Sequence, residues 1–409
     1  MTEWKTVKLG DVADAITVGF VGQMALEYKE NGIPFLRSQN VEPHKLKLDG
    51  LKYISEEFHN KIKKSALSPG DVVIVRTGKP GATAVIPSSL KIANCSDLVI
   101  VRPGEKIDSR YLSYFINSIG NIHIAAHLVG AVQQHFNVGS ARNFEIPLPP
   151  LPTQKKIAKV LGDLDDKIEL NRRMNETLEE MAMAVYRHYF VNFGLPPGAK
   201  EEATECPFGK LIEHPEMGMI PEGWGVEALD KVADFLNGLA MQKFPPIGNE
   251  FLPVIKIREM RQGITDSSDK ASINIDSKYI VNSGDVLFSW SGSLDVILWF
   301  GKKGGLNQHL FKVTSKSYPK WLYYFTLKFL LPDFQRIASD KATTMGHIQR
   351  HHLSDAFIAI PKKEILQSID KKLTPILNQI ISTNSEIQSL TETRDYLLPR
   401  LLSGDVRVE

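Results

Sequence analysis

The polar residues best suited to chemistry or binding lie in short segments between apolar runs, and most of them carry hydrogen-bonding groups. Arginine, lysine, glutamine, histidine and hydroxyl side chains match the donors and acceptors on the edges of nucleic-acid bases. The candidates in the first part of the chain are Arg37, Ser38, Gln39, Arg76, Thr77, Lys79, Gln133, Gln134 and His135. The candidates in the second part are Lys256, Arg258, Ser291, His347 and Gln349. The alternative is that these residues only form turns and polar surface.

Motifs for enzymatic chemistry are absent from the sequence. None of its Pro-Pro pairs has the Asp/Asn-Pro-Pro-Tyr context of an adenine methyltransferase, and no Gly-x-x-x-x-Gly-Lys-Ser/Thr phosphate loop occurs. His347, His351 and His352 have a spacing that would suit zinc, but no cysteine accompanies them and the first part of the chain has no counterpart. The sequence therefore predicts no catalytic residue, no metal and no other cofactor in this chain.

The segments that carry the candidate residues belong to blocks that occur twice in the same order. The matched blocks are residues 4–14 and 224–234, 32–37 and 251–256, 68–78 and 282–292, 111–115 and 321–325, 133–136 and 345–348, and 146–147 and 360–361. Chance matches would not stay collinear, so we interpret the chain as a duplication. The residues between the blocks differ widely, which indicates one scaffold used twice with different functional surfaces.

Each half has the pattern of a mixed α and β domain. Residues 71–75 and 285–289 are short apolar runs that follow a glycine, and this pattern predicts buried strands. Residues 98–102 and 310–313 are expected to form further strands. Residues 109–118 and 319–331 have the apolar spacing of helices.

A long helix is predicted after each half, because apolar residues alternate at steps of four and three over more than four heptads. The first seam comprises Ile157, Leu161, Leu164, Ile168, Asn171, Asn175 and Leu178, and the second comprises Ile369, Leu373, Ile376, Ile380, Ile387 and Leu390. Two such stripes in register predict that the helices pack on each other. The seam asparagines would fix the register. Pro375 removes a backbone donor and is expected to kink the second helix.

These elements predict an α+β fold with two duplicated α/β domains and two long antiparallel coiled-coil helices, related by a pseudo-twofold axis. The expected domains are residues 1–150 (head one), 151–192 (first helix), 193–222 (a Gly/Pro-rich return linker), 223–361 (head two) and 362–409 (second helix and tail). Antiparallel helices would hold two heads tens of ångströms apart. That separation suits double-stranded DNA, whose successive major-groove faces come every 34–36 Å.

The composition fits a folded chain of two or three domains. Of 409 residues, 43% are hydrophobic and 23% are charged, and no apolar run is long enough for a membrane span. The two cysteines make no disulfide framework, and the N-terminus lacks the apolar core of a secretory signal, so we expect the cytoplasm. A net charge of +2 is low for a nucleic-acid binder acting alone. It fits a protein whose partners supply much of the contact with phosphates.

Three further sequence motifs indicate the family to which this pattern is similar. Residues 146–157 join a proline-rich turn to the first helix, residues 220–224 read Ile-Pro-Glu-Gly-Trp, and residues 397–404 close the chain with Leu-Leu-Pro-Arg-Leu-Leu-Ser-Gly. In this order, and with the duplication, the sequence resembles the specificity subunit of type I restriction-modification enzymes over nearly its whole length. The second boundary, residues 360–365, lacks the Pro-Leu-Pro-Pro-Leu of the first, and Pro375 interrupts the second spacer.

The resemblance implies two target-recognition domains, each reading one half of a split, asymmetric DNA site, with the helices setting the unread gap. It implies that the chain is a non-catalytic subunit that joins two DNA adenine methyltransferase subunits and the restriction/translocase subunits. S-adenosylmethionine, ATP and Mg²⁺ would then belong to those partners. The alternative is a coiled-coil scaffold that binds only protein. That interpretation accounts for the helices but not for two variable heads.

Overall fold

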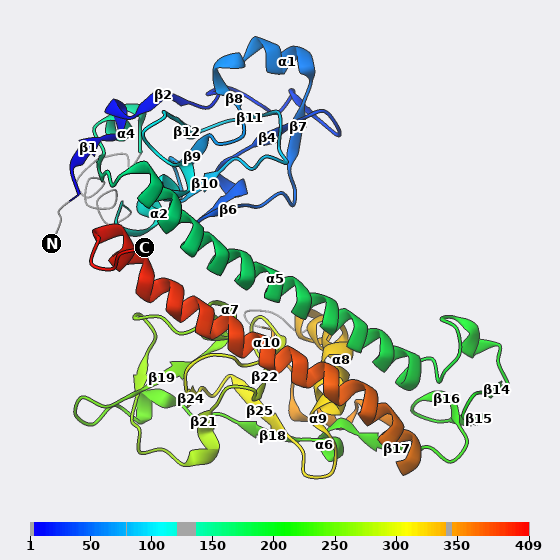
Figure 1. Cartoon of the computed structure of the whole chain (residues 1–409). Helices are drawn as coiled ribbons and strands as arrows, with labels where there is room; N and C mark the ends of the chain where they lie inside the picture. The colour runs from blue at the N-terminus through cyan, green and yellow to red at the C-terminus, as the bar shows by residue number, and fades with distance from the viewer. Residues whose placement is uncertain (1–3, 79, 121–135, 341–345, 409) are drawn as a thin grey trace. The chain divides into compact units, whose positions relative to one another are not determined.

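The computed structural model of the chain describes residues 4–78, 80–120, 136–340 and 346–408, which fold into two compact units (Figure 1). Unit 1 comprises residues 1–168 and 390–409, and unit 2 comprises residues 169–389. The two long helices, α5 (Leu151–Phe190) and α10 (Lys363–Ser403), each contribute one part to unit 1 and the other part to unit 2. Each unit is described below by itself.

Head one, the globular part of unit 1, is built on two sheets. Its strands are β1 (Thr6–Lys8), β2 (Ala13–Val18), β3 (Tyr28–Lys29), β4 (Ile33–Leu36), β5 (Val41–Glu42), β6 (Lys45–Leu46), β7 (Lys52–Ile54), β8 (Ala66–Leu67), β9 (Val72–Val75), β10 (Thr83–Val85), β11 (Ala93–Cys95), β12 (Leu98–Pro103) and β13 (Glu145–Pro147). Its helices are α1 (Glu56–Lys61), α2 (Ser109–Phe115), the π-helical η4 (Ile116–Gly120) and α4 (Val138–Arg142). The antiparallel sheet has the order β10-β9-β12-β2, and the second has the order β3-β7-β4-β11-β8 with β4 and β11 parallel.

Head two, the globular part of unit 2, repeats this arrangement. Its strands are β17 (Gly225–Ala228), β18 (Asp234–Asn237), β19 (Leu252–Ile255), β20 (Lys270–Ala271), β21 (Ile280–Val281), β22 (Val286–Ser289), β23 (Asp295–Leu298), β24 (Gly304–Leu306), β25 (Leu310–Thr314) and β26 (Phe357–Ile360). Its helices are α6 (Leu229–Val232), α7 (Ile257–Gln262), α8 (Lys320–Asp340) and α9 (Arg350–Ser354). The sheet order β23-β22-β25-β18 matches that of head one, and β19 and β24 form the equivalent parallel pair.

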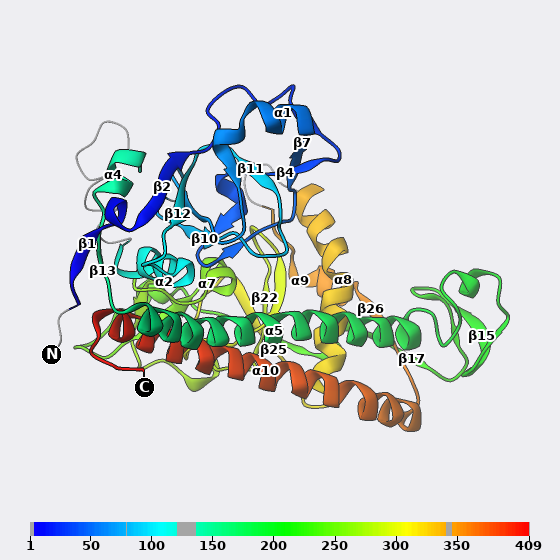
Figure 2. The same cartoon turned by 45° about the horizontal axis from the view of Figure 1, so that its top comes forward.

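The matched topology confirms the predicted fold class of two repeated mixed α/β domains accompanied by two long helices. The segment predicted as a return linker is more structured than its glycines and prolines indicated. It folds into the antiparallel strands β14 (Glu205–Cys206), β15 (Gly209–His214) and β16 (Gly218–Pro221), beside the C-terminal end of α5 in both views (Figures 1 and 2).

The strands predicted from β-branched runs form the centres of the cores. All four residues of β9 and of β22 are buried, and burial of each large side chain contributes about 1.5–3 kcal/mol. Gly70 and Gly284 precede these strands at φ values of 90° and 85°, a region that suits glycine. The first turns of α2 and α8 hold these glycines in place. Ser109 Oγ donates to the Gly70 carbonyl at 2.7 Å, and Lys320 Nζ donates to the Gly284 carbonyl at 2.8 Å.

The two long helices run antiparallel within unit 2. Asn171 Nδ2 donates to Glu386 at 3.0 Å, and Lys372 Nζ donates to Tyr189 Oη at 2.6 Å, so residue numbers rise along α5 as they fall along α10. Of the predicted seam, the structure buries Ile157, Leu161, Ile168, Asn171, Asn175, Ile369, Leu373 and Ile380, and leaves Leu164, Leu178, Ile376, Ile387 and Leu390 half-buried. Leu377, which the heptad count missed, is 3% exposed. Helix α10 continues without a break through Pro375.

Asn175 is the least satisfied residue of the seam. Among the described residues, neither its amide nitrogen nor its amide oxygen has a hydrogen-bond partner, although both atoms are buried. An unpaired buried polar group costs about 1–3 kcal/mol. We therefore expect Asn175→Leu to stabilise unit 2 by roughly 1–2 kcal/mol, measured as a higher urea midpoint of the purified chain. Asn171→Leu is the matched control, and it should gain less because it sacrifices the bond to Glu386. A lower midpoint for Asn175→Leu would show that the amide contributes to stability.

A polar network attaches head one to the helices of unit 1. Tyr114 Oη of α2 donates to Asp165 of α5 at 2.6 Å, and Asp165 also forms an ion pair with Arg394 of α10 at 2.8 Å. The His44 ring stacks on Tyr114 with centroids 4.5 Å apart. In unit 2 the equivalent tyrosine, Tyr324, donates to Glu179 of α5 at 2.9 Å. A tyrosine on the equivalent helices α2 and α8 therefore contacts an acidic residue of α5 in both units.

His44 makes the stability of unit 1 depend on pH. Burial is the main cause that lowers the pKa of His44 to about 4; Asp165 and Asp395 oppose this shift, and Arg394 adds to it. In the unfolded chain the pKa returns to about 6.5, so the unfolded state binds the extra proton between these values. We expect the unfolding free energy of unit 1 to fall as the pH drops from about 6.5 towards 4.

The measurement is the urea midpoint of the full chain between pH 4 and 7. His44→Asn serves as the comparison because asparagine tolerates the left-handed backbone at this position, where φ is 68°, and does not titrate. Its pH profile should be flatter over this window. A profile as steep as that of the natural chain would assign the pH dependence to other groups.

Candidate nucleic-acid interface

In head one, three loop segments meet where the parallel strands β4 and β11 end. The Ser96 amide donates to the Leu36 carbonyl at 3.0 Å, which brings Arg37 and Asp97 to the same edge. The loop after β9 reaches this edge as well, because Arg76 Nη1 donates to Asp97 at 3.0 Å and Thr77 Oγ1 donates to its other oxygen at 2.7 Å. The sequence-predicted Arg37, Arg76 and Thr77 therefore lie at one edge of the domain.

The segment that follows β4 is a short, internally bonded turn. The Arg37 amide donates to Asn40 Oδ1 at 3.0 Å, and Arg37 Nη2 donates to the Gly50 carbonyl at 3.2 Å. The Arg37 guanidinium also lies 5.8 Å from the centroid of the Tyr28 ring. Ser38 is half-buried and Gln39 is exposed. Gln39 is thus the most accessible of the three predicted residues in this turn.

Four predicted residues of head one, Lys79, Gln133, Gln134 and His135, lie outside the described residues. The described chain resumes at Phe136, whose amide donates to the Arg76 carbonyl at 3.4 Å.

Head two places its own loops at the equivalent edge. The Asn307 amide donates to the Ile255 carbonyl at 3.2 Å, as Ser96 does to Leu36 in head one. Ser291 Oγ, on the loop after β22, forms a hydrogen bond with His309 Nδ1 at 2.9 Å. The Ile348 amide donates to the Trp290 carbonyl at 2.9 Å, so the segment with His347 and Gln349 joins this edge. Both of these predicted residues are exposed, whereas Ser291 is buried.

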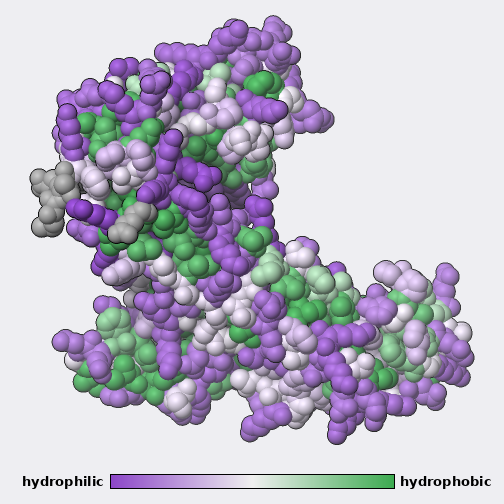
Figure 3. Space-filling model, in the orientation of Figure 1, coloured by the Kyte–Doolittle hydropathy of each residue, from purple (hydrophilic) through white to green (hydrophobic). Residues whose placement is uncertain are grey.

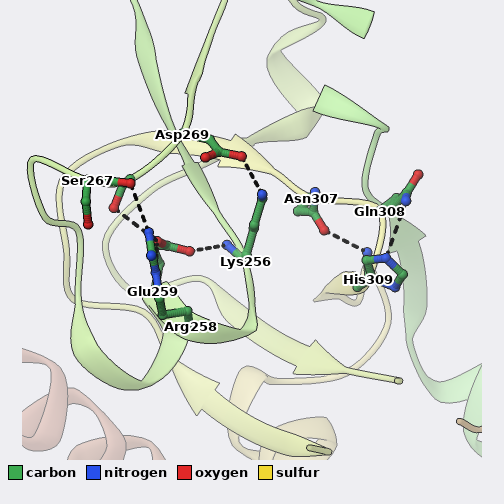
Figure 4. Close-up of polar contacts among 9 residues, drawn as sticks. Lys256, Arg258, Glu259, Ser267, Asp269, Asn307, Gln308 and His309 are labelled. Carbon is green, nitrogen blue, oxygen red and sulfur yellow. Dashed lines mark hydrogen bonds and ion pairs between the residues drawn. The ribbon is translucent and has the colours of Figure 1, made fainter. Parts of the chain in front are cut away.

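Lys256 and Arg258 follow β19 and are each held by an acidic residue (Figure 4). Lys256 forms an ion pair with Asp269, and Arg258 Nη2 contacts Glu259 at 2.7 Å and the Ser267 carbonyl at 3.1 Å. Glu259 is buried, which by itself would raise its pKa. Hydrogen bonds from Arg258, from Ser268 and from the Lys256 amide outweigh the burial and lower the pKa of Glu259. The buried carboxylate therefore fixes the turn, while the Arg258 side chain remains 51% exposed.

Trp290 is held in place by hydrogen bonds and by packing on Phe311. Its Nε1 donates to Asn237 Oδ1 at 3.0 Å and to the Gln308 carbonyl at 3.2 Å, and its ring lies 6.0 Å from that of Phe311. It forms one wall of a pocket of about 320 Å³ that is also lined by Asn237, Phe311, His347, Ile348, Gln349 and Arg350. The indole is thus fixed by its neighbours at the edge of head two.

Several residues at these edges were missed by the sequence analysis. They are Asp97 in head one, and Asn237, Asp269, Asn307, Gln308 and His309 in head two. A signal did exist for two of them, because Asp97 and His309 come directly before the predicted strands 98–102 and 310–313. The matched blocks end before those positions, so the repeat gave no indication of them.

The surface of each unit is in keeping with a polar interface. Hydrophilic residues predominate on the face of each unit seen in Figure 3, with smaller apolar patches between them. Among the described residues, no group of three histidine, cysteine, aspartate or glutamate side chains is placed to hold a metal ion. His352 Nδ1 instead accepts from the Gln349 amide at 3.0 Å. Within the described part of the chain, no helix is long and apolar enough to cross a membrane.

The fold defines a class of protein with two repeated mixed α/β domains and two long helices. Comparison with known families identifies this class. The model of the type I restriction modification DNA specificity domain matches residues 1–180 and 221–392, one stretch for each repeat. The chain belongs to this family, which confirms the resemblance predicted from the sequence.

Individual relatives agree with this assignment. The type I restriction enzyme MjaIX specificity subunit of Methanocaldococcus jannaschii is 24% identical over 100% of this chain and 94% of its own length. The HindI specificity subunit of Haemophilus influenzae is 26% identical over 65% of this chain and 70% of its own length. The crystal structure of the type I restriction-modification S subunit from M. genitalium shares the fold with a TM-score of 0.58. It covers 98% of this chain and 96% of its own at 13% identity.

Proposed function

We propose that this chain is the specificity subunit of a type I restriction-modification complex and that each head reads one half of a bipartite, asymmetric site in double-stranded DNA. The observation that carries the proposal is the pair of equivalent edges, which share a scaffold but differ in hydrogen-bonding groups. Head one presents Arg76, Thr77 and Asp97 where head two presents Trp290, Ser291 and His309. Different groups on the same scaffold would recognise different bases.

The helices are proposed to set the unread gap between the two half-sites. Helices α5 and α10 contain 40 and 41 residues, which corresponds to about 60 Å at 1.5 Å per residue. Length of this order is compatible with half-sites separated by about one or more turns of the duplex.

The complex is proposed to contain two DNA adenine methyltransferase subunits and restriction/translocase subunits, with S-adenosylmethionine, ATP and Mg²⁺ bound by those partners. This chain would then contribute specificity without catalysis and would act on chromosomal DNA in the cytoplasm. Exposed Leu170, Met174 and Met181 on α5 offer apolar surface for a protein partner. The low net charge of +2 also favours partners that supply phosphate contacts.

The test is to co-express the chain with its cognate methyltransferase subunit and to sequence methylated adenines in the host DNA. We expect a split motif of two short defined halves around a gap of fixed length. Assembly of an active methyltransferase that marks no defined sequence would contradict the proposal. That outcome would favour the coiled-coil scaffold that binds only protein.

A further inference from the structure

The residue directly before β12 in head one and the residue directly before β25 in head two occupy equivalent places. Leu98 pairs with Val75 in head one, and Leu310 pairs with Ser289 in head two, so the strands β12 and β25 begin in the same register. Asp97 and His309 immediately precede these strands. The duplication thus places two chemically different side chains at one structural position.

Each side chain is fixed by a hydroxyl group from the equivalent neighbouring loop of its own head. Thr77 Oγ1 donates to Asp97 Oδ2 at 2.7 Å, and Ser291 Oγ forms a hydrogen bond with His309 Nδ1 at 2.9 Å. Thr77 and Ser291 are each the second residue after β9 and β22. A threonine and a serine therefore supply the same support in both heads, while the supported side chain changes.

In head one the accessible member of the ion pair is the acid. The Arg76 side chain is 19% exposed and the Asp97 side chain is 43% exposed. Asp97 also has a φ of 52°, a left-handed backbone that aspartate tolerates better than most residues. A carboxylate has about four lone-pair sites, and Arg76 and Thr77 use two of them, so Asp97 retains acceptor capacity towards solvent. Arg76 is thus placed to orient Asp97 rather than to read a base itself.

We propose that Asp97 and His309 are specificity-determining residues of head one and head two, with Arg76, Thr77 and Ser291 as positioning residues. Asp97 would accept a hydrogen bond from the exocyclic amino group of a cytosine or an adenine in the major groove. Both ring nitrogens of His309 are engaged, Nδ1 by Ser291 Oγ at 2.9 Å and Nε2 by Gln308 Nε2 at 3.3 Å, so His309 would present its ring together with the Gln308 amide at the same position. The heads would therefore select different bases there. This inference rests on the proposed function.

The experiment is to compare variants of the full chain, each co-expressed with the methyltransferase subunit, by sequencing methylated adenines. Asp97→Asn keeps the shape of the side chain and replaces one acceptor oxygen with a donor. We expect discrimination to fall roughly 5- to 150-fold at one base pair of the head-one half-site, with the head-two half unchanged. His309→Ala should relax one base pair of the other half only. Glu42→Gln is the matched control, since the Glu42 side chain is also 43% exposed and ion-paired, with Lys45 at 3.5 Å.

Two further variants separate reading from positioning. Thr77→Val leaves the carboxylate in place but removes one support, so it should relax the same base pair to a smaller extent. Arg76→Ala should also relax that base pair, whereas relaxation at a different base pair would make Arg76 a reader and overturn its positioning role.

A defined motif in the natural chain that stays unchanged in Asp97→Asn and His309→Ala would overturn this inference and leave the proposed function intact. Complete loss of methylation in Asp97→Asn, combined with no change in Thr77→Val, would overturn it as well. Absence of any defined motif in the natural chain would instead contradict the proposed function.

Discussion

Replacing residues 1–145 with the first head of another family member is expected to change one half of the methylated sequence completely and to leave the other half as it was. The described polar edge of head one, from Arg37 to Asp97, lies within this segment, whereas α5 begins after it at Leu151. Head two has a separate edge with its own supporting bonds. Exchange of one edge therefore leaves the other edge intact.

The replacement head must keep its attachment to the helices. Tyr114 donates to Asp165, which stays in the chain, so the incoming head should carry a tyrosine at the equivalent position. The measurement is the methylated motif of the hybrid chain co-expressed with its methyltransferase subunit. The reciprocal exchange of residues 223–361 is the control and should change only the other half. A change of both halves by a single exchange would contradict independent reading.

Insertion of one heptad into each long helix is expected to lengthen the unread gap by roughly three base pairs. Seven residues add about 10.5 Å to a helix, and the duplex rises about 3.4 Å per base pair. The best places are between Ile168 and Glu169 in α5 and between Ser389 and Leu390 in α10, where both helices pass from one compact unit to the other. Insertions there leave the packing inside each unit unchanged, and a whole heptad preserves the seam.

The measurement is again the methylated motif, in which both half-sites should be retained and only the gap should change. Insertion into α5 alone is the control. It places the two seams out of register and should prevent assembly of an active complex. An unchanged gap in the double insertion would show that the helices do not set the spacing.

The repeat was the strongest predictor of the fold. Collinear blocks predicted two similar domains, and the buried strands β9 and β22 lie where glycine and β-branched runs placed them. Heptad spacing predicted both long helices, because an apolar helix stripe is visible as a local periodicity of the sequence. The same spacing gave no indication that Leu377 is more deeply buried than Ile376, since that difference depends on how the partner helix packs.

The candidate site was harder to predict because its residues are brought together by long-range pairing. Arg76 and Thr77 were identified from a repeated block, but their partner Asp97 lies about twenty residues further along the chain. The base readers predicted from the sequence include arginines and lysines and no carboxylate. The structure pairs Lys256 with Asp269 and buries much of Arg76, and such exposures follow from the surrounding loops rather than from residue type.

The end of the chain completes the core of head one. Leu401 and Leu402 are buried with Leu9 and Ile146 in one apolar cluster, and Gly404 lies so close to Trp4 that a Cβ atom there would come within 2.7 Å of the indole nitrogen. In unit 2, Trp224 instead packs on Phe190 and Phe193, which precede it in the chain. During synthesis, the set of core residues of head two is therefore complete before that of head one. The buried core of head two uses α10 as far as Ile380, whereas the core of head one, which is translated first, also needs Leu401 and Leu402.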